Sequence, residues 1–426
     1  MQKYNEEISG RDKINFLHFL IIIFLIQNVS FAQIEPDTSR KTIGMNTTVD
    51  STMRFDTTNQ VKSAPLDIGL TRGLFIITPD QKMQMRILGS VRYLVDFDNI
   101  DLQNKNSYNT YEIPTGDQNV RLPNYYNGLS QTRLGFEVTR RTETGDVFVR
   151  LETDFAGADR FRIRHAYGQY GRFLIGQSWS LFSQISALPA TVNFGGPPGS
   201  VSLRTPQIRY FTPWKVLNSN LELALEYVIP DLELPDSLQL TSFQFLPTVS
   251  AEIDKNFDWG YMQISGIIPV LSARNIHDSL LIKAGWGLSA SAIVNTWDKG
   301  KWYFQAVGGK AITPFINNLN GTGLTIITNP DNGAYLPFSF GGYITYEHTV
   351  SEFIYSNLTY GMVQVEQKSF NAENTFHLGY AFMFNTFWNL VEGAKVGGEI
   401  IWGKRIDKSK ISGDALRINF LFYYDF

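Results

Sequence analysis

Hydrophobic side chains recur at every second position over much of the chain, and this period constrains the fold more than any other feature of the sequence. In residues 85–97, for example, Ile87 and Val95 alternate with Arg86 and Asp96. Because successive side chains of a β-strand point to opposite faces of a sheet, each such segment is predicted to be a strand with one apolar and one polar face. Further alternating segments lie at residues 133–138, 147–155, 221–227 and 376–385. The sequence therefore predicts an all-β fold.

Three features favour a transmembrane β-barrel over a soluble β-sandwich, in which period-two strands also occur. The polar faces carry charges in strand after strand, which a water-filled lumen tolerates, and the apolar faces carry large aromatic side chains, as lipid-facing surfaces do. Short and long connections also alternate, as periplasmic turns and extracellular loops do. Short turns are predicted near 142–145, 170–172, 298–300 and 349–351, and long extracellular loops near 98–130, 177–201, 230–242 and 313–333.

The number of alternating segments predicts an antiparallel transmembrane β-barrel of about 16 strands in residues 71–426. Sixteen strands leave an open aqueous lumen, whereas eight would be filled by side chains. The last segment ends on the aromatic Phe426, which resembles the sorting signal of bacterial outer-membrane barrels. The predicted location is the bacterial outer membrane, where the barrel is surrounded by lipid. The formal net charge of −3 gives no indication of a nucleic-acid partner.

The first 32 residues have the features of a secretion signal. A basic start with Lys3 and Arg11 precedes the apolar run 16–26, which is too short to cross a bilayer comfortably as a helix. Small residues at Ser30 and Ala32 predict cleavage before Gln33, with an uncleaved anchor as the alternative. Residues 33–70 are rich in Thr, Ser, Asp and Asn without sustained apolar periodicity, so they are predicted to form a flexible periplasmic leader.

Arginines are concentrated in one part of the predicted barrel. Fourteen lie between Arg72 and Arg209, and only three follow residue 220. We expect one wall of the lumen to be rich in arginine beside the loop 177–201. A guanidinium group stays charged and can hold a carboxylate with two hydrogen bonds, so such a wall would attract small anions. The candidate constriction and substrate-binding residues are Arg92, Arg133, Arg150, Arg162, Arg164, Arg204 and Arg209.

A wall whose charges cancel is the alternative for part of this region. If residues 147–156 and 160–170 form a hairpin, Asp154 faces Arg162 and Glu152 faces Arg164 across the ladder. Those pairs would stiffen the wall and offer a solute little net charge. Stronger candidates, because no partner is obvious from the sequence, are Arg92, Arg133, Arg204 and Arg209.

Glycine and proline are clustered in the long loop 177–201. The run from Gly195 to Gly199 predicts a rigid and compact segment. Folded into the barrel, this loop would form the constriction, and an ordinary extracellular loop is the alternative. The glycines do not match a phosphate-binding loop, because no Lys-Ser or Lys-Thr pair follows them.

Five short motifs follow one another along the arginine-rich region. They are Arg133-Leu134-Gly135-Phe136, Arg164-His165-Ala166-Tyr167, Gly176-Gln177-Ser178-Trp179-Ser180, Phe194-Gly195-Gly196-Pro197, and Arg204 with Pro206-Gln207-Ile208-Arg209-Tyr210. In content and spacing, about residues 85–212 resemble the DcaP-type porins, and the remainder matches only as a generic barrel. The resemblance implies a trimer of sixteen-stranded barrels and passive diffusion of small anionic nutrients, such as dicarboxylates, guided by lumen arginines. Residues 33–70 lack the heptad-patterned coiled coil of better-known members, so a trimer would depend on barrel–barrel contacts alone.

Two other classes of function are compatible with an outer-membrane barrel. A hydrolase needs a nucleophile or metal with a base and an orienting group. No Gly-x-Ser-x-Gly or His-Glu-x-x-His motif is present, and the parity of His165 places it on the lipid side. The histidines that follow the signal are scattered, at His165, His277, His348 and His377.

The other class is a structural or adhesive barrel that binds a partner through its long loops. The loop 98–130 offers Tyr108, Tyr111, Tyr125 and Tyr126 for such a contact. No cysteine is available for disulfides or thiolate metal sites, and no cofactor is expected. The sequence favours a non-enzymatic porin for small hydrophilic solutes, preferably anions, over both alternatives.

Overall fold

The computed structural model describes residues 73–426 apart from seven internal gaps. The gaps are residues 158–160, 215–218, 229–240, 245, 275–279, 297–298 and 330–332. The predicted secretion signal and leader lie outside the described residues, as does most of the predicted loop 230–242. Among the described residues, no helix has the length and hydropathy needed to cross a membrane.

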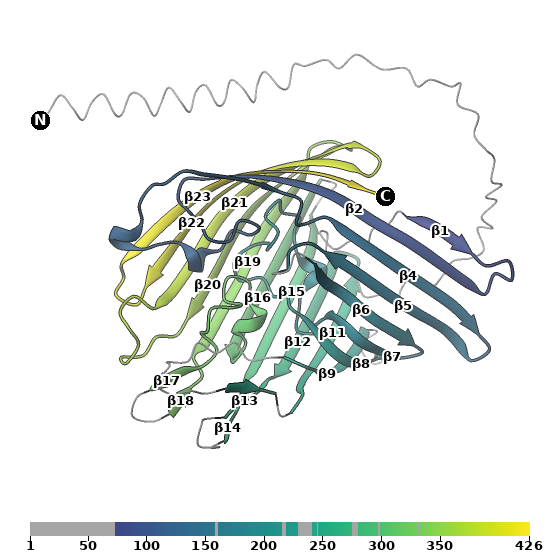
Figure 1. The fold of residues 1–426 in the computed structure, drawn as a ribbon, viewed down its shortest axis with the longest axis horizontal. Helices are drawn as coiled ribbons and strands as arrows, with labels where there is room; N and C mark the ends of the chain where they lie inside the picture. Colours follow the sequence, from purple (N-terminus) through teal and green to yellow (C-terminus); the bar gives the residue numbers. More distant parts are fainter. Residues whose placement is uncertain are drawn as a thin grey trace, which may run out of the picture. The chain divides into compact units, whose positions relative to one another are not determined.

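Sixteen antiparallel strands pair in sequence order and close into a barrel (Figure 1). Closure occurs at β2 (Met83–Asp98), where Ser90 is paired with Arg133 of β4 and with Asp425 of β23 on opposite edges. This confirms the predicted fold class and strand number. The other barrel strands are β4 (Arg133–Thr142), β5 (Gly145–Asp154), β6 (Arg162–Tyr170), β7 (Phe173–Trp179), β8 (Arg204–Trp214), β9 (Ser219–Glu226), β11 (Thr248–Phe257), β12 (Gly260–Ile268), β15 (Trp286–Thr296), β16 (Gly300–Lys310), β19 (Phe338–Thr349), β20 (Ile354–Val365), β21 (Phe376–Val391), β22 (Ala394–Asp407) and β23 (Ser412–Asp425).

Two short strands extend the sheet beside β2, and the other short strands lie in the loops. β1 (Leu74–Ile77) pairs with residues 84–87 of β2 on the same edge as β23, which pairs with residues 90–98. β3 (Asn124–Gly128) pairs with residues 94–98 on the opposite edge, where β4 pairs with residues 83–90. The remaining elements are β10 (Thr241–Phe243), β13 (Val270–Arg274), β14 (Leu280–Ala284), β17 (Ile327–Asn329), β18 (Gly333–Tyr335) and the short 3-10 helices η2 (Thr110–Glu112), η3 (Gly116–Gln118), η4 (Ile185–Ala187) and η6 (Thr313–Phe315).

The alternating pattern places apolar side chains outside and mostly polar side chains inside. In β23, Phe420 and Phe422 are exposed on the outer face, whereas Arg417 and Asn419 are buried inside. Aromatic rings gather on the outer face of neighbouring strands, where Tyr360 lies 4.9 Å and Trp402 lies 6.1 Å from the ring of Phe382. This surface suits a lipid environment.

Three long loops fold into the barrel, and only one of them was expected to do so. They are the loop 99–123, the constriction loop (residues 180–203) and the loop 311–326. Asn193 Oδ1 of the constriction loop accepts a hydrogen bond of 2.7 Å from the backbone N–H of Tyr108. The loop 311–326 meets the constriction loop through a backbone hydrogen bond of 3.0 Å from Ser202 to Phe315.

The inward position of the constriction loop confirms the prediction, but residues 98–130 and 313–333 are not simple extracellular loops. Tyr108 and Ile113 are buried against the inner face of β21 and β22, in contact with Met383 and Ile401. Period-two analysis finds strands and says nothing of how a loop folds back. The apolar residues of these loops therefore gave no signal of a location inside the barrel.

Candidate functional site

Five arginines line a cavity of about 160 Å³ between the barrel wall and the constriction loop. Alternation along β2, β4 and β8 turns Arg92, Arg133 and Arg204 inward, and β6 contributes Arg162 and Arg164. No carboxylate is among the residues that line this cavity. The rest of the lining is Trp179, Ile185, Leu188, Phe194, Gly195, Ser202 and Asn317.

A β-bulge in β6 directs two consecutive side chains into the lumen. Thr153 of β5 is paired with Ile163, and Glu152 is paired with His165, so Arg164 is the extra residue. A bulge of this kind changes which side chains face inward. Arg164 and His165 are both buried, with exposed fractions of 1% and 5%. The prediction that His165 faces lipid is therefore wrong, because simple alternation does not anticipate the bulge.

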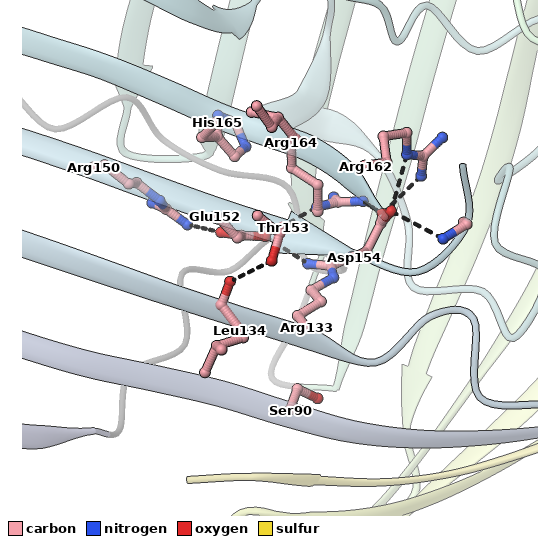
Figure 2. A network of polar contacts seen from close by, with 12 residues as sticks. Ser90, Arg133, Leu134, Arg150, Glu152, Thr153, Asp154, Arg162, Arg164 and His165 are labelled. Carbon is pink, nitrogen blue, oxygen red and sulfur yellow. Dashed lines mark hydrogen bonds and ion pairs between the residues drawn. The ribbon is translucent and has the colours of Figure 1, made fainter. Parts of the chain in front are cut away.

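Two carboxylates hold the β6 arginines (Figure 2). Arg162 forms a two-pronged contact with Asp154, with hydrogen bonds of 2.9 and 2.7 Å. Arg164 donates to Glu152 at 2.9 Å and to Asp154 at 2.8 Å. The predicted pairing of Asp154 with Arg162 is correct. Glu152 pairs with His165 in the ladder, yet the bulged Arg164 still reaches it.

The other three lining arginines leave the cavity with an excess of positive charge. Arg133 lies 3.7 Å from Glu152, and the Arg204 guanidinium lies 3.7 Å from the ring centre of Trp179. Arg92 donates to Ser90 Oγ at 2.9 Å, and no described carboxylate lies within salt-bridge distance of it. Within the described residues, five guanidinium groups line the cavity, and the carboxylates of Glu152 and Asp154 contact three of them.

Arg150 and Arg209, the two remaining candidates, lie outside the cavity lining. Arg150 contacts Glu152 and lies 3.6 Å from Glu137. Arg209 donates to Glu222 at 3.1 Å and to Gln207 at 3.0 Å. The structure therefore brings together five of the seven arginines proposed from the sequence.

Aromatic rings support the arginines from the loop side, and sequence reasoning did not assign them this position. The Phe194 ring lies 5.6 Å from the guanidinium of Arg162 and 5.8 Å from that of Arg164. Such contacts between a cation and a ring face are attractive and orient the planar group. Phe194 and Trp179 belong to motifs identified in the sequence, so these motifs could have indicated that both rings lie at the site. Asn317 had no comparable signal.

The family model described as DcaP outer membrane protein matches residues 72–233, which include all five lining arginines. This part of the chain is similar to the DcaP outer membrane proteins. Among solved structures, the outer membrane channel DcaP of Acinetobacter baumannii is similar to this chain, with a TM-score of 0.71 and 19% identity over 82% of this chain and 99% of that one. A comparison with curated proteins finds no significant match.

Two further structures have the same type of barrel. An anion-selective porin from Comamonas acidovorans has a TM-score of 0.54 and 13% identity over 81% of this chain and 100% of that one. The trimer form of OmpT, an outer membrane protein of Vibrio cholerae, has a TM-score of 0.50 and 10% identity over 81% and 99% of the two chains. At these identities the similarity shows the porin fold, which this chain shares.

Proposed function

We propose that this DcaP-like chain is a porin for passive diffusion of small hydrophilic solutes that prefers anions such as dicarboxylates. The observation that carries the proposal is the cavity lined by Arg92, Arg133, Arg162, Arg164 and Arg204 and by no carboxylate. A narrow site of one charge sign raises the local concentration of the opposite ion.

The arrangement suits transit better than tight capture. Asp154 and Glu152 hold Arg162 and Arg164 in place, so these side chains stay spread along the wall. An entering carboxylate can replace part of its hydration with guanidinium N–H groups and pass from one to the next. Several weak sites in series permit both entry and release.

Reversal potentials in planar bilayers across a KCl gradient test this function. The wild-type pore is expected to prefer chloride over potassium, and a dicarboxylate is expected to carry current and to compete with chloride. The double variant R92Q/R133Q is expected to lose much of this preference. R172Q is the control, because Arg172 lies outside the cavity and contacts Tyr210 and Thr212. A clear preference of the wild type for cations contradicts the proposal.

The proposal includes no enzymatic step and no cofactor. His165 lies on β6, His348 on β19 and His377 on β21, so the described histidines do not form one site. Within the described parts of the chain, no group of three histidine or acidic side chains is placed to hold a metal.

We further propose that the working form is a homotrimer in outer-membrane lipid. The apolar outer face supports this assembly, and OmpT of Vibrio cholerae has a trimer form. Native mass spectrometry in detergent is expected to give three chains per particle, and a purely monomeric particle that conducts normally contradicts the proposal.

Residues 1–32 are proposed to be a secretion signal and residues 33–70 a periplasmic leader before the barrel of residues 71–426. The basic start, the apolar run and the small residues before Gln33 support this division. N-terminal sequencing of protein purified from outer membranes is expected to begin at Gln33, and a retained Met1 contradicts it.

A further inference from the structure

A row of polar side chains crosses the inner face of the barrel opposite the base of the constriction loop. Asn357 of β20, Asn385 of β21, Glu399 of β22 and Asn419 of β23 are successive partners in the ladder, and all four are buried. Asn357 donates to Asn385 Oδ1 at 2.9 Å, and Asn385 donates to Glu399 Oε2 at 2.9 Å. The row is therefore linked internally, and it directs both donors (Asn357, Asn385) and acceptors (Glu399) at the loop.

This row holds the tip of the constriction loop, residues 190–193. Glu399 Oε1 accepts a hydrogen bond of 2.8 Å from the backbone N–H of Asn193, and Oε2 accepts one of 3.1 Å from Val192. The carbonyl of Ala190 accepts hydrogen bonds of 3.0 and 3.1 Å from Asn357 and Asn385. One carboxylate thus satisfies two consecutive backbone donors that no strand or helix pairs.

The position of the base of the loop, near Leu181, depends less on a contact with a carboxylate of the wall. Glu226 Oε1 accepts a hydrogen bond of 3.1 Å from the backbone N–H of Leu181, and Oε2 accepts one of 3.0 Å from Thr205. Leu181 follows the end of β7 by two residues, so the strand already restrains it. The tip is not continuous with a strand, and it is held by contacts with the barrel wall and with Tyr108 of the loop 99–123.

The tip lies between the barrel wall and the arginine cavity. On the wall side, Ala190 and Val192 pack against Leu94, Phe387 and Leu421. On the other side, Phe194 and Gly195, which follow the tip directly, line the arginine cavity. Movement away from the wall would therefore carry these two residues into the cavity.

We propose that Glu399 is a positioning residue that holds the constriction loop out of the arginine-lined passage. It touches no solute and acts through the backbone of Val192 and Asn193. The inference rests on the chain being a channel and is independent of its preference for anions.

Single-channel recording of E399Q in planar bilayers tests this role. Val192 and Asn193 donate to different oxygens of Glu399, and in the amide one of these oxygens is replaced by an NH2 donor, so one of the two contacts is lost. We expect frequent brief closures and a mean conductance roughly twofold lower than wild type, because the loop enters the passage. The matched control is E347Q, which removes a carboxylate of the inner face that contacts Tyr303 and Lys301 and not the loop.

Hydrogen exchange measured by mass spectrometry gives a readout that a general loss of stability would not produce. Peptides from residues 188–196 of E399Q are expected to exchange faster, while peptides from β20–β22 exchange as in wild type. The proposal would be overturned if E399Q conducted steadily at the wild-type level and its loop exchanged as in wild type. It would also be overturned if the control E347Q closed as often as E399Q.

A second variant covers the case in which E399Q does not fold, as judged by its mobility on semi-native gels. N385A removes the hydrogen bonds from Asn385 to Ala190 and to Glu399, and the one that Asn385 accepts from Asn357, while leaving the carboxylate in place. It is expected to produce the same closures at lower frequency, and a silent N385A overturns the proposal. Because closures and ion preference are separate measurements, failure here is distinguishable from failure of the anion-porin function.

Discussion

At the scale of single residues, the site depends on how buried charges are shared. Glu152 lies 2.9 Å from Arg164 and 3.7 Å from Arg133, and it also contacts Arg150. One carboxylate therefore serves three arginines on adjacent strands. Its two effects are opposed, because it orients the guanidinium groups and also cancels part of their charge.

The variant E152Q is expected to increase the preference for anions, because it removes a negative charge beside the cavity. It is also expected to lower the free energy of unfolding by about 1–3 kcal/mol through weaker charged hydrogen bonds. Reversal potentials and urea unfolding in detergent measure the two effects. E137Q is the control, because Glu137 contacts Arg86 and Arg150 away from the cavity. A lower anion preference in E152Q contradicts the argument.

Glu366 gives a pH dependence outside the membrane-spanning strands. The hydrogen bond from Lys368, with a second from the Tyr335 hydroxyl, lowers the pKa of the Glu366 carboxyl to about 2. A carboxyl with a lowered folded-state pKa adds stability above its unfolded value of about 4.3, and the contribution is lost as pH falls through about 2. The local structure around Tyr335 should therefore loosen at the acid end of this range.

Limited digestion with pepsin at about pH 4 and about pH 2 tests this expectation. Wild type is expected to be cleaved near Tyr335 faster at the lower pH, after allowance for the activity of the protease. E366Q is expected to show no such difference, because its amide does not titrate. Equal pH dependence in both proteins rules out Glu366 as the cause.

At the scale of elements, the constriction loop reaches the wall through a close backbone contact at Gly199. Its φ of +79° lies in the left-handed region, and a Cβ there would come within 2.2 Å of the Met362 carbonyl oxygen and 2.3 Å of the Gly342 nitrogen. Both atoms are backbone, so they cannot move aside as a flexible side chain could. The loop therefore fits β19 and β20 only with glycine at this position.

The variant G199A is expected to destabilise the folded barrel by more than backbone strain alone, which costs about 1–3 kcal/mol. G321A is the matched control, because Gly321 has a φ of +76° with nothing within 4 Å of the added Cβ. Urea unfolding measures the loss of stability in both variants. The loss in G321A gives the cost of backbone strain, and the additional loss in G199A gives the cost of the close contact. Equal losses of stability in the two would show that the close approach at Gly199 is unimportant.

The elements also mark where sequence reasoning succeeded and where it stopped. Period two is a property of the strand backbone, so the strands and the arginine-rich wall could be predicted from residues such as Arg92 and Arg133. The bulge at Arg164 depends on pairing with β5, which no single strand reveals. The inward loops depend on distant partners, such as Asn318, which accepts a hydrogen bond of 3.0 Å from the backbone of Thr110.

At the scale of the whole molecule, closure depends on β2 and β23. Nine residue pairs join these strands, and Phe426 continues the pairing through backbone hydrogen bonds of 3.1 and 3.0 Å with Gly89. Without β23, the edges of β2 and β22 would carry unpaired backbone groups in lipid, which is costly. The closed barrel therefore requires its last strand.

Deletion of residues 412–426 is expected to abolish the folded barrel. Semi-native electrophoresis is the measurement, because folded barrels migrate differently before and after heating. The truncated chain is expected to migrate identically in both states. Deletion of β1 (Leu74–Ile77) is the comparison, because it removes a strand that lies outside the closed ring of sixteen. A truncated chain that still shifts on heating contradicts the role of β23.

The inward loops pack against β19–β22, and the arginine cavity lies between the constriction loop and the part of the wall that includes β2, β4, β6 and β8. The number of strands therefore does not by itself set the width of the lumen. All five lining arginines come from residues 92–204. New solute preferences could therefore arise by substitution within this single stretch of the gene, while the side that bears the loops remains unchanged. For engineering, mutagenesis confined to that stretch is the economical way to retune permeability without rebuilding the barrel.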